Sequence, residues 1–451
     1  MVQAISRLHA TRRQMLAGSA ALLGSAMLPG RTMAADGPWS ARPAGTTKSV
    51  EFFGWQYGDI YEVLGKKFQA DWGVPFNSNF TPYNDYAKTL STTFATGQQI
   101  DTGPAFNTVF GVWIDQGVIE PLDGLPGLKE YVADFTPLQL RSSTYKGKIY
   151  GMPYYTTAWV WNYYEELGRK AGLKAPFASY EELIDQSLKA KRDGLSNYPI
   201  IWVAGAGPEH LLGTWVALTW NMHKAKFFDD RGNHQLGAGS GARQALKWLA
   251  ETFTKHNISD PESLKVQMGG STNAFKAGQH LYRGPNHHYT LRQINDPSQS
   301  SIAGKVKVHG FPGDGRSIAN ANVYCMMTAK GNKDWAWKQL QYLGGRTKDG
   351  EYMQAQKLMR EQMFGSGFKS IMDSPELKQA WSQWADVPTL LDTWNKSDFI
   401  GDVIQSFLEP WHLPWTDTIN IESHKALRGE ITADAACDNI IAGIAAAKRA
   451  S

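Results

Sequence analysis

The first part of the chain alternates short apolar runs with longer stretches of helical period. Strands are predicted over 50–53 and 75–80, each followed by a run in which large apolar residues recur every four positions, the spacing of one helix face. Those positions are Ile60, Leu64, Phe68 and Trp72 in the first helix, and Tyr86, Leu90 and Phe94 in the second. Asp59 and Glu62 have the spacing of a capping box, and Gly97 is a natural stop for the second helix. Strand then helix, twice over, predicts an α/β layer with a parallel sheet.

The same pattern returns later in the chain. Ser179 and Glu182 have the spacing of a second capping box, and Gly344-Gly345 follows the last striped helix. The apolar stripes are Ala242, Leu246, Leu249 and Phe253 in one helix, and Ala336, Leu340 and Leu343 in another. The last hundred residues have a mainly helical pattern, and the mature length suggests two or three compact units.

The N-terminal segment has the pattern of an export signal. Arg12-Arg13 precedes an apolar run that ends at Leu28, and small residues surround Ala35, so we predict a secretory signal over 1–35. The adjacent arginines and weakly hydrophobic core indicate the twin-arginine route, with an ordinary Sec signal as the alternative. No cysteine lies near the cleavage site to accept a lipid, and no later stretch has the roughly 18 apolar residues of a membrane span. We therefore expect a soluble protein exported to the periplasm.

Removal of this segment changes the charge of the protein. The net charge is +4, and the signal holds no acidic residue and these arginines: Arg7, Arg12, Arg13 and Arg31. The mature chain is left with 42 basic residues against 42 acidic ones. A neutral surface argues against a partner such as nucleic acid or an anionic membrane, because either would require a basic field.

Motifs for catalysis, metals and cofactors are missing from the sequence. There is no nucleophile elbow, zinc-protease motif or phosphate loop, and the glycine-rich run over 237–241 reads as a turn before a helix. His287-His288 could supply metal ligands, but adjacent side chains point apart and no nearby Cys, Asp or Glu completes a set. Cys325 and Cys437 could pair outside the cytoplasm; two separately buried thiols are the simpler interpretation. We expect no cofactor and no metal.

The order of short motifs resembles extracellular solute-binding protein family 1, the maltose-binding-protein-like substrate-binding proteins of sugar ABC transporters. The motifs are Gly97-Gln98-Gln99-Ile100-Asp101, Gly117 to Asp123, Lys146-Gly147-Lys148-Ile149-Tyr150-Gly151-Met152-Pro153, Trp161-Asn162, Lys170-Ala171-Gly172-Leu173, Ala274 to Gly278, and Gly429-Glu430-Ile431-Thr432. Each motif alone is weak, but together they cover the mature chain in order. Ile100 and Trp161 replace the proline and tyrosine that the family usually shows.

The resemblance implies an α/β fold of two lobes, with a hinge and an interlobe cleft that closes on a small solute. We expect lobe one to hold 48–155 and 309–365, and lobe two 156–308 and 366–451. The chain would cross the hinge at 153–157, 310–313 and 365–368. The implied partners are a carbohydrate, either a monosaccharide or an oligosaccharide, and an inner-membrane ABC permease. The protein would be a monomer and not an enzyme.

A sugar site needs flat aromatic faces and side chains that donate and accept hydrogen bonds. The chain has 17 tryptophans, several beside small or polar residues, although core packing is the alternative for any one of them. Asp101 could instead cap a turn, and Arg283 could be a surface charge. Tyr154 and Tyr155 could touch both the ligand and the hinge. The predicted binding residues are Trp55, Tyr57, Asp101, Asn107, Tyr154, Tyr155, Trp202, Arg283, Asn286, His287, Asn322, Trp411 and Trp415, with Asn320 as a further polar candidate.

Two other functions stay open from the sequence. A polyamine, a polyol or another small solute could occupy the same architecture, but the apparent cleft loops carry few of the acids that a polycation requires. The twin-arginine signal also keeps an exported redox enzyme in view, because that route carries folded proteins; no cofactor motif supports it.

Overall fold

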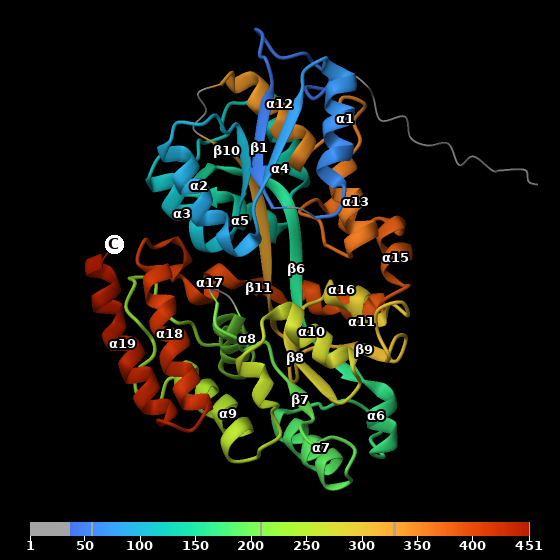
Figure 1. Ribbon diagram of the computed structural model, residues 1–451, viewed down its shortest axis with the longest axis vertical. Helices are drawn as coiled ribbons and strands as arrows, with labels where there is room; N and C mark the ends of the chain where they lie inside the picture. The colour runs from blue at the N-terminus through green and yellow to red at the C-terminus, as the bar shows by residue number, and fades with distance from the viewer. Residues whose placement is uncertain (1–36, 56, 208–209, 328–330, 451) are drawn as a thin grey trace, which may run out of the picture.

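The computed structural model describes residues 37–55, 57–207, 210–327 and 331–450. The predicted signal over 1–35 lies outside the described residues. Two lobes are joined by two long strands that run through the middle of the molecule, β6 (Gly151–Tyr164) and β10 (Ser317–Met326) (Figure 1). β6 and β10 are antiparallel neighbours in a sheet of order β2-β1-β3-β10-β6-β8-β7, in which β11 also pairs with β10 and β9 with β6. One mixed sheet therefore passes through both lobes.

Lobe one surrounds the β2-β1-β3 end of the sheet (Figure 1). β1 pairs in parallel with both β2 and β3, as the strand–helix alternation predicts. The elements of this lobe are β1 (Val50–Gly54), α1 (Ile60–Trp72), β2 (Phe76–Phe80), η1 (Tyr83–Asp85), α2 (Tyr86–Ala95), β3 (Thr102–Ala105), α3 (Asn107–Asp115), α4 (Leu128–Asp134), α5 (Pro137–Ser143), β4 (Thr144–Tyr145), β5 (Lys148–Ile149), α12 (Lys333–Gly344), α13 (Met353–Gln362) and α14 (Lys369–Met372).

Lobe two surrounds the other end of the sheet and is mainly helical (Figure 1). Its elements are α6 (Glu165–Lys170), α7 (Tyr180–Arg192), β7 (Ile200–Ile201), α8 (His210–His223), α9 (Gly241–Thr254), η2 (Pro261–Leu264), α10 (Met268–Lys276), β8 (Tyr282–His287), α11 (Thr290–Asn295), β9 (Val306–His309), α16 (Val387–Asn395), β11 (Ser397–Phe399), α17 (Ile400–Ile404), η3 (Ser406–Leu408), α18 (His412–Leu427) and α19 (Ala433–Ala450). The helix α15 (Pro375–Trp381) lies beside α13 and leads the chain back to lobe two. None of the helices in these described segments is long and apolar enough to cross a membrane.

Each lobe has its own hydrophobic core, rich in aromatic rings. In lobe one the rings gather around Phe52, Tyr61 and Tyr324, and the ring centroids of Phe52 and Tyr61 lie 4.6 Å apart. The larger core of lobe two contains several fully buried tryptophans: Trp161, Trp202, Trp215, Trp381 and Trp415. Much of the tryptophan content is therefore used in packing, since such side chains bury large apolar areas.

Most of the predicted elements are confirmed, with one error in the capping. The strands at 50–53 and 75–80 correspond to β1 and β2, and the striped helices to α1, α2, α9 and α12. Ser179 accepts a hydrogen bond from the backbone N–H of Glu182, as its capping box predicts. Asp59 makes no such bond and pairs instead with Lys357 of α13, at 2.9 Å. Cys325 and Cys437 are separate buried thiols, as expected.

The first and third expected hinge segments lie next to each other. Gly365 and Thr156 exchange backbone hydrogen bonds of 2.9 and 3.0 Å. The second expected segment, 310–313, lies elsewhere: Asn221 of α8 donates to the carbonyl oxygen of Pro312 at 3.2 Å, within lobe two. The chain then reaches lobe one along β10, so we place this crossing within β10 itself. Lys369 and Ser370 bond to Ala133 and Asp134 of lobe one, so we place the start of the last lobe-two segment after α14 and not at residue 366.

Candidate functional site

A cavity of about 690 Å³ lies between the lobes, within the size range of small-molecule sites. Lobe one contributes Tyr57, Tyr83, Ala87, Lys88, Phe106 and Val109. The two long strands contribute Tyr155, Thr157, Trp159, Asn320 and Asn322. Lobe two contributes Val203, His210, Gln267, Met268, Gly269, Asn286, His287, Tyr289 and Leu413. A solute in this cavity would touch both lobes and the strands that join them.

The strand contribution follows from the two-residue period of a sheet. Alternate residues of a strand share a face, so Tyr155, Thr157 and Trp159 of β6 project to the same side. Cross-strand partners also share a face, and the register pairs Tyr155 with Asn322 and Thr157 with Asn320. Two antiparallel strands thus present an aromatic and amide surface to the cavity, which we call the ribbon face: Tyr155, Thr157, Trp159, Asn320 and Asn322.

Hydrogen bonds fix the orientation of the ribbon face. The indole N–H of Trp159 donates to Oδ1 of Asn320 at 3.0 Å. Oγ1 of Thr157 is 2.8 Å from Nδ1 of His287, which extends the network to β8 in lobe two. The backbone N–H of His287 donates to Oδ1 of Asn286 at 2.6 Å, whereas Nδ2 of Asn286 is buried with no partner. The cavity wall therefore has preoriented amide groups.

Aromatic rings form much of the remaining wall. The ring of Tyr155 stacks on Phe364 with centroids 4.2 Å apart, and Tyr289 of lobe two lies 4.5 Å from the same Phe364. The ring of Tyr57 meets Tyr155 edge-on at 5.9 Å. Rings from both lobes thus converge on the hinge strands, where they could contact the apolar face of a solute.

Burial determines the protonation state of the site histidines. Burial first, and then the neighbouring His288, His210 and Arg283, lower the pKa of His287 to about 3. Burial also lowers the pKa of His210. Both imidazoles are consequently neutral near pH 7 and can each donate and accept a hydrogen bond. Lys88 is the one charged side chain among the described residues that line the cavity, and these residues include no carboxylate.

Five of the predicted binding residues line the cavity: Tyr57, Tyr155, Asn286, His287 and Asn322. Asn320, the further candidate, lines it too. Three more lie just behind the wall. Trp55 is only 3% exposed and meets the ring of Tyr83 edge-on at 5.1 Å. Asn107 follows Phe106 at the start of α3, and Tyr154 lies on the opposite face of β6, where its hydroxyl accepts from Tyr61 at 2.9 Å.

The assignment of the other predicted residues to the binding site is wrong, because the structure places them outside the cavity. Asp101 lies at the far end of β3, where its carboxylate accepts the backbone N–H of Glu51 at 2.7 Å. It holds two chain segments together, and burial raises its pKa. Arg283 is fully buried, and its hydrogen bonds to described residues all go to neutral oxygens: Ser271, Thr272, Asn162 and Thr290.

The predicted tryptophan platforms of lobe two are core residues. Trp202 donates its indole N–H to Oγ of Ser259 at 2.7 Å, and Trp415 donates to the carbonyl oxygen of Ile440 at 3.0 Å. Trp411 is 7% exposed and packs against Trp415. Pro414 stands in the first turn of α18, which begins at His412, and a proline is tolerated there.

Several residues that line the cavity were not among the predicted binding residues. Trp159 sits in a 14-residue strand that is buried throughout, so its neighbours gave no sign of a cavity. Tyr83, Phe106 and Tyr289 come from connecting segments near helix starts, and His210 begins α8. The two-residue spacing of Tyr155, Thr157 and Trp159 was the one feature of the sequence that could have indicated a shared face of a strand.

His288, the second histidine of the pair, faces away from the cavity. Its Nδ1 accepts the backbone N–H of Ala158 at 3.2 Å, and its ring lies 5.1 Å from Trp381 and 4.9 Å from Trp394. In the described part of the chain, no group of three or more His, Cys, Asp or Glu side chains is placed to hold a metal ion.

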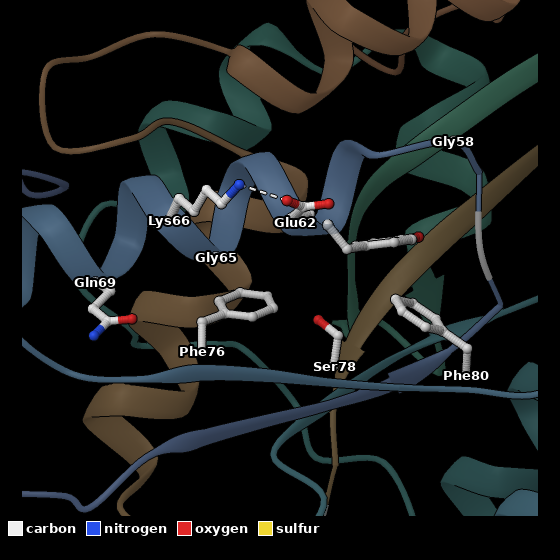
Figure 2. A pocket seen from close by; sticks show the side chains of 9 residues that line it. Gly58, Glu62, Gly65, Lys66, Gln69, Phe76, Ser78 and Phe80 are labelled. Carbon is white, nitrogen blue, oxygen red and sulfur yellow. Dashed lines mark hydrogen bonds and ion pairs between the residues drawn. The ribbon is translucent and has the colours of Figure 1, made fainter.

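A second, smaller hollow of about 380 Å³ lies on lobe one between α1 and β2 (Figure 2). Glu62 and Lys66 of α1 pair with each other at this hollow, and Phe80 is exposed at 41%. None of the predicted binding residues lines it. The interlobe cavity is thus the candidate site.

Solved structures with the same fold include proteins with bound sugars and polyols. A maltose-bound MalE3 of T. maritima has a TM-score of 0.74 at 18% identity, covering 88% of this chain and 99% of that one. A solute-binding protein of Agrobacterium vitis S4 with bound D-mannitol has a TM-score of 0.70 at 20% identity, covering 90% and 98%. At these identities the likeness establishes the fold.

The sequence is similar to several curated binding proteins and matches one family model. A putative binding protein of Brucella abortus is 26% identical over 291 residues, which is 63% of this chain and 68% of that protein. A mannitol-binding protein of Pseudomonas aeruginosa is 26% identical over 226 residues, 48% of each chain. The model for bacterial extracellular solute-binding proteins matches residues 55–346. The chain belongs to the family of bacterial extracellular solute-binding proteins.

Proposed function

We propose that this protein is the binding component of an ABC importer and captures a carbohydrate in the interlobe cavity. The carbohydrate would be a monosaccharide, an oligosaccharide or a related polyol. The main support for this proposal is the ribbon face. It combines the rings of Tyr155 and Trp159 with the amides of Asn320 and Asn322 on two paired strands. Sugars present apolar C–H patches and directional hydroxyls, and this combination of side chains is complementary to both.

The similar proteins support the same class of solute. Structures that share the fold contain maltose, D-mannitol and ribitol, and one curated relative is named a mannitol-binding protein. A polyamine is the weaker candidate. The one charged side chain among the described lining residues is Lys88, and a polycation would be repelled by it and would need carboxylates as partners.

Capture would proceed by closure of the lobes. A solute that touches lobe one, the ribbon face and lobe two at once stabilises the closed arrangement by its higher affinity for that arrangement. An inner-membrane permease would then recognise the closed protein, with no covalent step. The twin-arginine pattern at Arg12-Arg13 supports export to the periplasm, where we expect a monomer.

A thermal-shift panel tests the proposal. The mature protein would be heated with pentoses, hexoses, disaccharides, polyols, sugar acids and polyamines, since a bound solute raises the melting temperature. We expect a response confined to sugars, polyols or their derivatives. Tight binding of spermidine with no response to any saccharide or polyol would contradict the proposal, and so would a bound chromophore in the purified protein.

A further inference from the structure

The lining of the interlobe cavity changes in character from one lobe to the other. The strand register orders the ribbon face from Trp159, the partner of His287 in lobe two, to Asn322 near lobe one. β10 then pairs with β3 of lobe one, and Phe106 directly follows that strand and lines the cavity. The cavity therefore runs from a lobe-two end at His287 to a lobe-one end at Phe106.

Hydrogen-bonding side chains gather at the lobe-two end and along the ribbon face. Oγ1 of Thr157 lies 2.8 Å from Nδ1 of His287, and the indole N–H of Trp159 donates to the amide oxygen of Asn320. Asn322 adds a second amide at the far end of the ribbon face. Hydroxyl, imidazole and amide groups both donate and accept hydrogen bonds, so this part of the cavity is complementary to the hydroxyls of a sugar.

The lobe-one end of the cavity has a mainly apolar wall, which we call the apolar end: Tyr83, Ala87, Phe106, Val109 and Leu413. The ring centroids of Tyr83 and Phe106 lie 5.5 Å apart, and Val109 is in the first turn of α3, directly after Phe106. Ala87 and Leu413 are half-buried and pack against the same aromatic core of lobe one. Leu413 comes from the first turn of α18, so both lobes contribute apolar surface to this one end.

Few polar side chains accompany this apolar surface. Among the described lining residues of η1, α2, α3 and α18, the polar groups are the hydroxyl of Tyr83 and the ammonium of Lys88. Both residues are exposed, so their polar ends can stay in water while their apolar parts form the wall. Asn107 and Thr108, the first residues of α3, are buried and do not line the cavity. A second sugar ring at this end would lose water from its hydroxyls without gaining partners, which is unfavourable, whereas an apolar group would gain from burial.

The two ends of the cavity thus suit a solute with two unlike parts. We infer that the solute is a glycoside, whose sugar ring lies against the ribbon face and whose apolar aglycone, aromatic or alkyl, occupies the apolar end. The rings of Tyr83 and Phe106 would contact the aglycone, and Leu413 would cover it from lobe two. This inference rests on the proposed function and narrows its substrate class to sugars that carry an apolar substituent.

Matched series of solutes test the inference by calorimetry on the mature protein. For each pentose and hexose of the panel, in both anomeric forms, the series is the methyl, phenyl and cyclohexyl glycosides and a disaccharide of the same sugar. We expect the phenyl or cyclohexyl glycoside of the preferred sugar to bind at least about tenfold more tightly than its methyl glycoside and its disaccharide. The heat-capacity change on binding should also be more negative, because more apolar surface is buried. The phenyl and cyclohexyl arms show whether an aromatic or an alkyl group is preferred.

The series also separates the inference from the proposed function. Apolar glycosides that bind no more tightly than the methyl glycoside or the disaccharide would overturn the inference and leave the proposed function standing. Apolar glycosides that do not bind, while a saccharide or polyol does, would have the same consequence. Absence of binding by every glycoside, saccharide and polyol would overturn both.

Two variants locate the aglycone in the cavity. Leu413→Ala removes part of the apolar wall, and Ala87→Leu fills part of the apolar end. Each should lower the ratio of apolar-glycoside affinity to methyl-glycoside affinity by roughly fivefold or more, and the melting temperature shows that each variant is folded. Leu140→Ala truncates an exposed leucine of α5 that does not line the cavity; as the matched control, it should leave both affinities unchanged. An unchanged ratio in Leu413→Ala and Ala87→Leu, including equal losses for both glycosides, would overturn the assignment of the aglycone to the apolar end.

Discussion

Trp159 of β6 donates its indole N–H to Oδ1 of Asn320 in β10, 3.0 Å away, on the two strands that join the lobes. The bond fixes a large ring and an amide in one orientation in the cavity wall. Both groups are thus preorganised before a solute arrives, which reduces the cost of ordering them on binding.

Trp159→Phe should weaken solute binding by about 1–3 kcal/mol, because it removes this donor and part of the ring surface. Trp159 is the one tryptophan among the described residues that line the cavity, so the fluorescence change on solute addition should also shrink. Calorimetry and fluorescence titration measure both effects. Trp215→Phe is the control, because Trp215 donates to the carbonyl oxygen of Ala242 within the core of lobe two. Equal loss of affinity in both variants would argue that Trp159 acts through stability alone.

Trp415→Ala should destabilise the fold by about 3–5 kcal/mol, since it leaves a large cavity in the core of lobe two. Trp415 is fully buried and its N–H is used by α19. Urea unfolding measures the loss, and at temperatures where the variant stays folded its solute affinity should match the wild type within about twofold. A variant that keeps its stability but binds the solute more weakly would show that Trp415 belongs to the binding site.

The free energy of unfolding should fall as the pH is lowered from about 6.5 toward 3. Burial lowers the pKa of His287, His288 and His412 to about 3 in the folded protein. The unfolded chain has ordinary histidines with a pKa near 6.5, so it binds protons in this range that the native state does not. Each histidine adds a slope of about 1.4 kcal/mol per pH unit within that window, and the contribution is constant above pH 7.

Urea unfolding at pH 7, 6, 5 and 4 measures this dependence. His412→Asn should reduce the slope by about one proton, whereas His234→Asn, at an exposed position, should leave it unchanged. A slope that is unaffected by His412→Asn would show that the pH dependence does not come from the buried histidines.

An ion pair joins the two lobes. Arg141 of α5 lies 2.6 Å from Asp402 of α17, and both side chains are partly exposed. Exposed pairs contribute about 0.2–1 kcal/mol, so Arg141→Gln should weaken solute binding by no more than about fivefold at low salt and not at all in 1 M salt. Lys146→Gln is the control, because Lys146 pairs with Asp115 inside lobe one. A larger effect that persists in 1 M salt would assign Arg141 a direct role.

The fold could be predicted from local patterns, but the site could be predicted only in part. The four-residue spacing of Ile60 and Leu64 reports directly which face of α1 is buried. Asp101 and Trp415, by contrast, have side chains suited to a sugar site, and only their long-range partners, Glu51 and Ile440, show that they are structural.

The register between distant strands was the missing information. Tyr155 and Asn322 are 167 positions apart in the sequence. They become cross-strand partners only because β6 and β10 pair in this particular register. A shift of one residue would turn Tyr154 toward the cavity instead. No local pattern encodes that choice, whereas the polar character of Asn286, His287 and Asn322 in apolar surroundings was a usable sign.

Titration of the best solute from the panel into the wild type and into Asn322→Leu tests the central claim most directly. Asn322 is 8% exposed and faces the cavity from the ribbon face, and its side chain has the same number and branching of heavy atoms as leucine. We expect one solute bound per wild-type chain, and at least tenfold weaker binding to the variant with an unchanged melting temperature. Equal affinity for both proteins would contradict binding at the ribbon face.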